Sequence, residues 1–292
     1  MAHRPVRTAV LPVAGLGTRS LPATKAVPKE MLTVVDKPIV QYAIEEAREA
    51  GIERFVMVTG RNKGVIEDHF DDAYELEAVL EQRGKKTELT MLQTDVPGAG
   101  DMVFTRQQKP LGLGHAVWCA RHVVGDEPFA VLLPDDLMWG KPGAVKQLVD
   151  VYNQRGGCVV AAEEVPREKT NKYGIIAPGA AHGNVTEVKG LVEKPDPAVA
   201  PSTLSIIGRY ILQPELFDIL AKGERGAGGE IQLTDGMAKL IGKVPFHAVK
   251  TDCVRYDCGD KLGFLAANLA VGLARPDLGP ALRDIAERLL KG

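Results

Sequence analysis

The sequence predicts an α/β protein with a Rossmann-like sheet that is mixed but mostly parallel, helices on both faces, a small antiparallel portion and C-terminal helices. In the first half, short apolar runs rich in β-branched residues alternate with amphipathic segments, a pattern typical of parallel α/β sheets. In the second half, apolar runs follow one another across Gly/Pro turns, which indicates antiparallel strands. Hydrophobic residues make up 45% of the 292 residues, enough for a sizeable core.

Strands and helices alternate through the first half. We expect strands at residues 8–12, 54–59, 88–94, 129–133 and 158–163, and helices at residues 39–50, 64–81, 112–123 and 143–154. Pro38 stands where the start of a helix tolerates proline, and Gly51 suits its end. Because ligands bind beyond the carboxyl ends of parallel strands, functional motifs should directly follow strands.

The second half is read from the same periodicities. We expect strands at residues 175–177, 185–193, 204–212, 246–250 and 253–257, and helices at residues 214–221 and 230–241. Residues 261–292 are predicted to form two helices broken around Pro276 and Pro280. The first of these carries an apolar stripe that we expect in the core, with a subunit contact as the alternative. Its members are Leu262, Leu265, Leu269 and Leu273.

Charge and composition exclude several classes of protein. The 36 basic and 38 acidic side chains give a net charge of −2, too close to zero for non-specific binding to nucleic acid or to an anionic membrane. The longest stretch without a charged residue, 173–186, is shorter than a membrane-spanning helix. We therefore expect no nucleic-acid partner and no membrane association.

The N-terminus and the cysteines favour a cytoplasmic location. Arg4 and Arg7 precede an apolar stretch, but Pro12 interrupts it and no cleavage site of small residues follows. The cysteines are too few and too scattered for a disulfide scaffold, and none has the spacing of a zinc or redox pair. They are Cys119, Cys158, Cys253 and Cys258.

Residues 11–31, directly after the first expected strand, have the composition of a polyphosphate-binding loop. Gly15 and Gly17 let backbone N–H groups approach an anion. The loop also carries three cations, Arg19, Lys25 and Lys29. It lacks the third glycine of a dinucleotide fingerprint and the Gly-Lys-Ser/Thr of a Walker A loop. An ordinary glycine turn with solvated bases is the alternative.

This loop resembles the signature loop of the sugar-nucleotide pyrophosphorylase family, in which GxGTR is followed ten residues after the Arg by a Lys. Its continuation PATKAVPKEM at 22–31 resembles the members that use UTP and glucose 1-phosphate. Further motifs agree in order: RQ and GLGHA within 106–116, LPDD at 133–136, KYG at 172–174, VEKP at 192–195, GRY at 208–210 and GEIQLTD at 229–235. The departures are Ser20, Gly236 and a loop at 95–105 without a family pattern.

The resemblance implies a magnesium-dependent nucleotidyltransferase that condenses UTP with α-D-glucose 1-phosphate, releasing UDP-glucose and pyrophosphate. It implies a nucleotidyltransferase domain over residues 1–260, followed by C-terminal helices over 261–292. Within that domain we expect a nucleotide half over about 1–160 and a sugar-binding half over about 161–260. We also expect a homodimer or a homotetramer.

Asp135 and Asp257 are the predicted metal ligands. Each lies at the end of an expected strand, and Mg²⁺ needs only one or two protein carboxylates beside phosphate oxygens and waters. The resemblance implies that they hold the ion against the nucleotide phosphates. The alternative is that Asp135 and Asp136 cap the following helix or turn.

The resemblance also implies catalysis by positioning and charge stabilisation, without a covalent protein intermediate. Arg19 and Lys29 then stabilise the pentavalent phosphorus and the leaving pyrophosphate, with Lys25 assisting. Lys194 holds the attacking sugar phosphate. Glu193 accepts hydrogen bonds from sugar hydroxyls; a solvated strand end is the alternative for this dipeptide.

Gln107 has a planar amide that matches the O4 and N3–H edge of uracil. By resemblance it reads the base, although a surface amide is the alternative. The other nucleotide contacts implied are Ala14, Gly15, Gly17, Glu30 and Gly112. Gly174 lets backbone approach the sugar, or is a turn glycine. His115 is expected to be structural, because phosphate oxygens need no deprotonation.

Three other functions share some of these sequence features. An enzyme of the same family could use another base or sugar, for example dTTP in place of UTP. A binding module that senses sugar nucleotides would keep Gln107 and Glu193 but could lose the cations and the metal carboxylates, which are present here. A Rossmann oxidoreductase is weakened by the missing third glycine.

Overall fold

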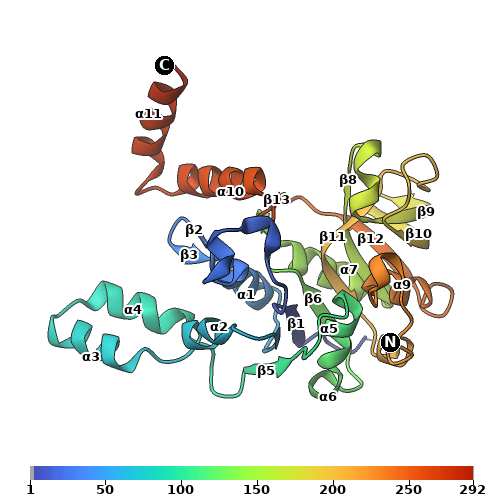
Figure 1. Ribbon diagram of the computed structural model, residues 1–292, viewed down its shortest axis with the longest axis horizontal. Coiled ribbons are helices and arrows are strands. Elements are labelled where there is room, and N and C mark those ends of the chain that lie inside the picture. The colour runs from blue at the N-terminus through green and yellow to red at the C-terminus, as the bar shows by residue number, and fades with distance from the viewer. Residues whose placement is uncertain (1–2, 292) are drawn as a thin grey trace.

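A nine-stranded mixed sheet forms the centre of the molecule in the computed structural model, which describes residues 3–291 (Figure 1). In spatial order its strands are β5 (Met102–Arg106), β4 (Arg54–Thr59), β1 (Thr8–Pro12), β6 (Phe129–Leu132), β11 (Leu204–Leu212), β8 (Cys158–Glu164), β12 (Phe246–Lys250), β10 (Val185–Glu193) and β9 (Gly174–His182). The first four are mutually parallel, as the alternation of strands and helices predicts. From β11 onward the sheet is mixed, which agrees with the antiparallel portion expected in the second half.

Helices cover both faces of the sheet, and two small strand pairs lie beside it (Figure 1). The helices are α1 (Ile39–Glu49), α2 (Gly64–His69), α3 (Tyr74–Gln82), α4 (Lys86–Asp95), α5 (Leu113–Cys119), α6 (Arg121–Val124), α7 (Ala144–Arg155), α8 (Glu215–Leu220), α9 (Leu233–Ala238), α10 (Lys261–Ala274) and α11 (Gly279–Leu290). The pairs are β2 (Thr33–Val34) with β3 (Lys37–Pro38), and β7 (Asp136–Trp139) with β13 (Val254–Asp257).

The apolar periodicity of the helices explains these two layers. Helix α1 buries Val40, Ala43, Ile44 and Ala47, one stripe of a helix, and with α7 it packs on one face of the sheet. Helices α5, α8 and α9 pack on the other face. Helix α1 ends before Gly51, which has a φ of 88°, a left-handed conformation that glycine adopts without strain.

The expected strand at 88–94 is wrong, because this segment lies in helix α4. Leu89 and Leu92 are its half-buried residues, and three-residue spacing puts both on one side of a helix, where α4 packs against α3. The edge strand of this half is β5 instead, in a region where no strand is expected from the sequence. Its residues are half-buried, apart from the exposed Arg106, and do not alternate.

Two expected helices are interrupted, and one is shorter than predicted. The expected helix at 64–81 divides between α2 and α3, where the Asp71 carboxylate accepts the Asp72 N–H at 2.9 Å, a local bond that competes with helix formation. The expected helix at 112–123 divides at Ala120 into α5 and α6. Helix α9 begins only at Leu233, because residues 230–232 bond to the segment ahead of α5 through Ile231 N–H to Leu111 O at 2.7 Å.

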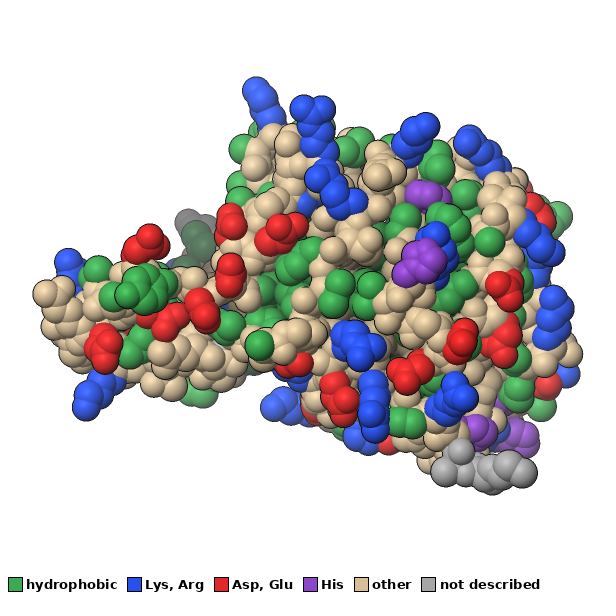
Figure 2. Space-filling model, turned by 90° about the horizontal axis from the view of Figure 1, so that it is seen from below, with side chains coloured by type: hydrophobic (Ala, Val, Ile, Leu, Met, Phe, Trp, Pro, Cys, Tyr) green, Lys and Arg blue, Asp and Glu red, His purple; other side chains and the backbone are tan. Residues whose placement is uncertain are grey.

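The apolar stripe of α10 does not lie in the core. Leu262, Leu265 and Leu269 are 74%, 64% and 46% exposed, so the core interpretation is wrong for these residues. Helix α11 also exposes large apolar side chains, with Leu289 and Leu290 78% and 88% exposed. Helix α10 packs on β2 and β13 and buries Ala267 and Val271 there, whereas α11 and the α3–α4 hairpin project from the body (Figure 1). Hydrophobic side chains are visible at the surface of the hairpin (Figure 2).

Candidate active site

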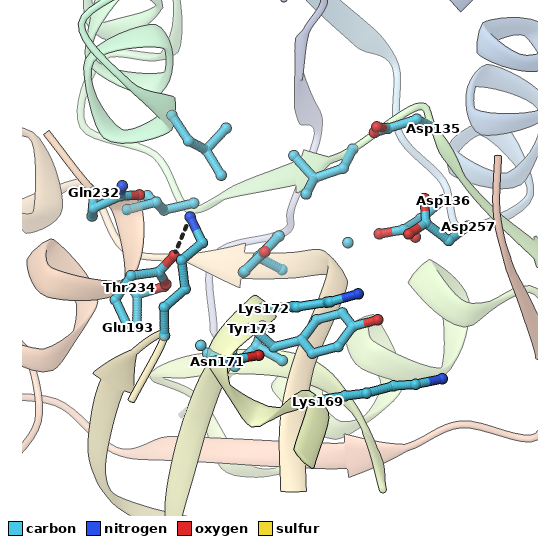
Figure 3. A pocket seen from close by; sticks show the side chains of 18 of the residues that line it. Asp135, Asp136, Lys169, Asn171, Lys172, Tyr173, Glu193, Gln232, Thr234 and Asp257 are labelled. Atoms are coloured by element: carbon cyan, nitrogen blue, oxygen red, sulfur yellow. Dashed lines mark ion pairs between the residues drawn. The ribbon is translucent and has the colours of Figure 1, made fainter. Parts of the chain in front are cut away.

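A cleft of about 890 Å³ opens at the carboxyl end of β6, the edge of a parallel sheet at which ligands bind. Asp135, Asp136 and Asp257 lie at one end, and Glu193 and Thr234 at the other (Figure 3). The short 3-10 helix Arg167–Lys172 forms another wall. The other lining residues include Arg19, Leu113, Lys169, Asn171, Lys172, Tyr173, Gly174, Lys194, Tyr210, Gln232 and Arg255.

Two cations of the 11–31 loop meet two carboxylates at strand ends. Lys29 Nζ donates to Asp135 Oδ2 at 2.6 Å. Arg19 lies between the two carboxylates, with Nη2 3.5 Å from Asp135 Oδ2 and Nη1 3.6 Å from Asp257 Oδ2. The four residues therefore converge from the loop, from the β6–β7 turn and from the end of β13.

Burial and charge act against each other at this cluster. Burial raises the pKa of Asp135, but the neighbouring charges of Lys29 and Arg19 and the Lys29 hydrogen bond outweigh it, so the pKa lies below its usual value. Burial likewise lowers the pKa of Lys29, yet Asp135 and Glu30 together hold it above its usual value. Both groups are therefore charged at neutral pH.

The donor set of this cluster fits magnesium. Two ionisable oxygens from Asp135 and Asp257 approach the same guanidinium, and no group of three or more His, Cys, Asp or Glu side chains that could hold a metal occurs within residues 3–291. Two carboxylates completed by phosphate oxygens and waters are what Mg²⁺ takes. A site dominated by nitrogen or sulfur donors would favour zinc.

Asp136 has a different environment from its neighbour. It begins β7 and caps no helix. Arg255 donates to its Oδ1 at 2.7 Å, and the backbone of Gly208 is so close that a Cβ there would lie 2.5 Å from Asp136 Oδ2. Burial, opposed by Arg255 and reinforced by Asp135 and Asp257, raises the pKa of Asp136 to about 6. The carboxylate of Asp136 is thus occupied by contacts within the protein.

Gly17 is required by the conformation of the loop, and its predicted contact with an anion stays a prediction. Gly17 has a φ of 66°, and a Cβ on it would lie 3.0 Å from the Thr24 side chain. Gly15 packs beside Lys29, and Ala14 follows β1 against the backbone of Gly60. Lys25 is exposed on the short 3-10 helix Ala23–Lys25, outside the lining of the cleft.

Glu30 is fully buried beneath the loop. Its Oε2 accepts from Lys63 Nζ at 2.8 Å, and Lys29 Nζ lies 4.0 Å from its Oε1. Burial raises the pKa of Glu30 although both lysines oppose the shift. This placement favours a supporting role under Lys29, and direct contact of Glu30 with a nucleotide stays a prediction.

Gln107 and Gly112 meet at the other side of the same sheet edge. Gln107 Nε2 donates to Gly112 O at 2.9 Å and lies 3.1 Å from His115 Nδ1. The amide nitrogen is therefore engaged by the protein, and recognition of a uracil by Oε1 stays a prediction. Gly112 has a φ of 112°, and its Cβ would lie 2.7 Å from Ile231 O. His115 holds the amide, in agreement with its expected structural role.

Gly174, Glu193 and Lys194 gather at the opposite end of the cleft. Lys194 Nζ lies 3.2 Å from Glu193 Oε1, the ion pair drawn in Figure 3. Gly174 pairs with Glu193 across β9 and β10, and a Cβ on it would lie 2.9 Å from Thr234 Oγ1. The glycine is thus needed for close packing, as well as keeping this end of the cleft open.

Sequence reasoning missed three residues that hold the site together. Arg255 precedes Asp257 by two positions, so period-two alternation could have placed both on one face of β13. Glu46 and Lys63 have no comparable signal, because their ionic partners Arg209 and Glu30 are distant in sequence.

Fold and site together define a nucleotidyltransferase, and a profile of the nucleotidyl transferase family matches residues 8–271. UTP–glucose-1-phosphate uridylyltransferase of Komagataeibacter xylinus is 56% identical over 89% of this chain and 91% of its own. The enzyme of that name from Bacillus subtilis strain 168 is 49% identical over 98% of this chain and 97% of its own.

Solved structures agree with these sequence relatives. UDP-glucose pyrophosphorylase from Acinetobacter baumannii, also solved with UTP bound, gives a TM-score of 0.89 at 41% identity and covers 97% of this chain and 99% of that chain. A UDP-glucose pyrophosphorylase complexed with UDP-glucose gives 0.82 at 40% identity, covering 92% and 100%. The chain belongs to the UTP–glucose-1-phosphate uridylyltransferases of the nucleotidyl transferase family. The predicted resemblance is confirmed.

Two general properties complete this description. Enzymes of the family usually use a divalent metal ion. Within residues 3–291, no helix combines the length and the apolar composition needed to cross a membrane.

The Glu30–Lys63 pair yields a stability prediction. Lys63→Met should lower the free energy of unfolding by about 3 kcal/mol, because Glu30 then stays buried without its close partner. Denaturant unfolding measures the effect. The double variant Lys63→Met/Glu30→Leu should recover much of the loss. If Lys63→Met were as stable as the wild type, Lys63 would not be the partner that stabilises buried Glu30.

Proposed function

We propose that the chain condenses UTP with α-D-glucose 1-phosphate to give UDP-glucose and pyrophosphate. The observation that carries this proposal is a single cleft with cations and paired carboxylates at one end and another carboxylate, that of Glu193, at the other. The printed names of relatives and the UTP and UDP-glucose complexes of similar structures support it.

The reaction needs one displacement at phosphorus. A phosphate oxygen of glucose 1-phosphate forms a bond to the α-phosphorus of UTP, and the bond from that phosphorus to the bridging oxygen of pyrophosphate breaks. Arg19 and Lys29 stabilise the charge on the pentavalent centre and on the leaving group, with the exposed Lys25 assisting. Lys194 holds the attacking phosphate in line, so the protein supplies position and charge rather than a nucleophile.

Asp135 and Asp257 are the proposed ligands of Mg²⁺. The ion, when bound, neutralises nucleotide phosphate oxygens and orients the α-phosphorus. Arg19 contacts both carboxylates in this structure. A bound Mg²⁺ would therefore use the same carboxylate oxygens as this guanidinium. Lys29 remains close enough to Asp135 to keep that carboxylate charged.

Base and sugar are recognised by opposite halves of the chain in this proposal. Residues 1–160 bind the nucleotide through Ala14, Gly15, Gly17, Gln107 and Gly112, with Glu30 supporting. Residues 161–260 bind the sugar through Glu193 and Gly174. The four cysteines are free thiols, in keeping with a reducing cytoplasm as the place of the reaction.

Assembly into a homodimer or a homotetramer is also proposed. The exposed leucines of α10 are the proposed contact, because a second copy of the same stripe would remove three large apolar side chains from water.

The first prediction concerns substrate choice. Pyrophosphate release should be fastest with UTP and glucose 1-phosphate among UTP, dTTP, CTP and ATP paired with several hexose 1-phosphates. Gln107 and the sequence 22–31 are the reason. If no pair releases pyrophosphate, the activity is wrong; if another pair is clearly faster, only the specificity is wrong.

Glu193→Ala should raise the KM for glucose 1-phosphate far more than the KM for UTP. Losing a hydrogen bond to a charged group costs about 1.5–3 kcal/mol, or roughly 10- to 150-fold. Steady-state kinetics with each substrate varied measures it. Glu187→Ala, an exposed position on the same strand, is the control. Equal damage to both KM values would exclude a sugar-site role.

Asp135→Asn should abolish most turnover, and added magnesium should restore it only in part, because the amide keeps the shape but loses the charge. The melting temperature should change little, as Asp135 lies beyond the buried strand. Asp150→Asn on the surface of α7 is the control. Near-normal turnover at limiting magnesium would move the metal assignment away from Asp135.

Leu265→Glu should reduce the mass of the particle in solution toward the 31.4 kDa of one chain, measured by light scattering. The wild type should have two or four times that mass. Val199→Glu, at an exposed apolar position outside α10, should leave the mass unchanged. A monomeric wild type would refute the proposed assembly.

A further inference from the structure

Arg209 is the largest of the fully buried side chains, with 1% of it exposed. It lies on β11, the strand that connects the parallel half of the sheet to the mixed half. A buried guanidinium is costly unless it is neutralised and its N–H groups are bonded. Its partners therefore indicate what the residue does.

Glu46 of α1 neutralises Arg209 from the face of the sheet. Arg209 Nε and Nη2 donate to Glu46 Oε2 at 3.0 and 2.7 Å. The other carboxylate oxygen, Oε1, accepts the backbone N–H of Val145 at 2.9 Å, in the first turn of α7. The pair is thus fixed by two helices as well as by the strand.

The remaining donors of Arg209 go to the backbone around Asp135. Nη1 donates to Leu133 O and to Gly208 O, both at 3.0 Å, and Nη2 donates to Asp136 O at 2.9 Å. The carbonyls of Leu133 and Asp136 stand on either side of Pro134-Asp135. One planar group, whose donors have fixed directions, therefore holds both ends of the turn that carries Asp135.

The Asp135 backbone is tied at a third point. Its carbonyl accepts the N–H of Cys258 at 2.7 Å, next to Asp257. The turn thus has its two flanking carbonyls bound by Arg209 and its own carbonyl bound to the segment that carries the second carboxylate. Movement of the Arg209 guanidinium would change the direction of Asp135 without touching any substrate.

We propose that Glu46 and Arg209 are positioning residues, which hold the β6–β7 turn so that the Asp135 carboxylate is directed into the metal site. This inference rests on the proposed function, in which Asp135 binds Mg²⁺. A buried ion pair is often no more stabilising than an apolar pair of the same size. A contribution to stability therefore does not explain the pair, whereas holding the direction of the turn does.

Arg209→Lys and Glu46→Gln test the inference. Lysine keeps the charge but cannot bond Glu46 and both turn carbonyls as a planar fork, and glutamine keeps the shape of Glu46 but removes its charge. Ile211→Ala is the matched control. Ile211 is fully buried two residues further along β11, so its replacement by alanine leaves a cavity without removing a contact to the turn. Asp135→Asn reports on the metal site itself.

Calorimetric titration with Mg²⁺ in the presence of UTP and without glucose 1-phosphate measures metal affinity apart from turnover. Arg209→Lys and Glu46→Gln should weaken Mg²⁺ binding about 10-fold or more, as loss of residues behind metal ligands does. Ile211→Ala should lower the melting temperature and leave the affinity unchanged. The KM for glucose 1-phosphate should stay close to that of the wild type in both positioning variants.

The inference would be overturned if folded Arg209→Lys or Glu46→Gln bound Mg²⁺ with unchanged affinity and only lost melting temperature, as the control variant does. If Arg209→Lys does not fold, Glu46→Gln decides alone, since it alters no side-chain volume. If Asp135→Asn also leaves the affinity unchanged, the proposed metal site is wrong. If Asp135→Asn weakens binding and the positioning variants do not, only this inference fails.

Discussion

The contact between Lys29 Nζ and Asp135 Oδ2, 2.6 Å long, is the interaction on which the arrangement of the site depends. It joins the glycine-containing loop after β1 to the turn after β6, two segments that only the parallel pairing of these strands brings to one edge. Removing both charges from water is costly, and each is kept ionised by the other. The charges of the two side chains therefore depend on each other, and Arg19 and Asp257 complete the cluster.

Two buried ion pairs support this contact, one under each of its two residues. The buried Glu30–Lys63 pair lies under Lys29, and the buried Glu46–Arg209 pair lies under the Asp135 turn. Ionic groups of this kind are expensive to bury, and here each one contacts a residue adjacent to the reacting phosphates in the proposed reaction. The charge of the site is thus balanced within the protein before any substrate arrives.

The parts of this structure that the sequence predicted are those with local signals. Strands β1, β6 and β11 are mainly apolar and buried along almost their whole length, so composition reveals them although β11 includes Ser205 and Arg209. Arg19 and Lys29 lie in the loop that follows β1, and Asp135 lies in the turn after β6, at the sheet edge where ligands bind. The parallel pairing of β1 and β6 places their ends together, whereas Asp257 ends β13, which pairs antiparallel with β7 outside the nine-stranded sheet.

The parts that sequence reasoning missed depend on contacts distant in the chain. Arg209 and Glu46 are 163 positions apart, and no periodicity connects them. The half-buried edge strand β5 has no alternation, while residues 88–94 were assigned as a strand although only packing on α3 decides their structure. The leucines of α10 follow the same spacing whether a helix packs in a core or against another subunit, so their exposure could not be read from the pattern.

Direct displacement at phosphorus, without a covalent protein intermediate, is the central claim of this account. It is tested most directly by the stereochemistry of the reaction with UTP that carries a chiral α-phosphorothioate. A single in-line attack by glucose 1-phosphate predicts UDP-glucose that carries the sulfur on its α-phosphorus, with inverted configuration at that phosphorus. Retention of configuration would require two displacements, and therefore a nucleophilic side chain, and would contradict the claim that position and charge alone carry the catalysis.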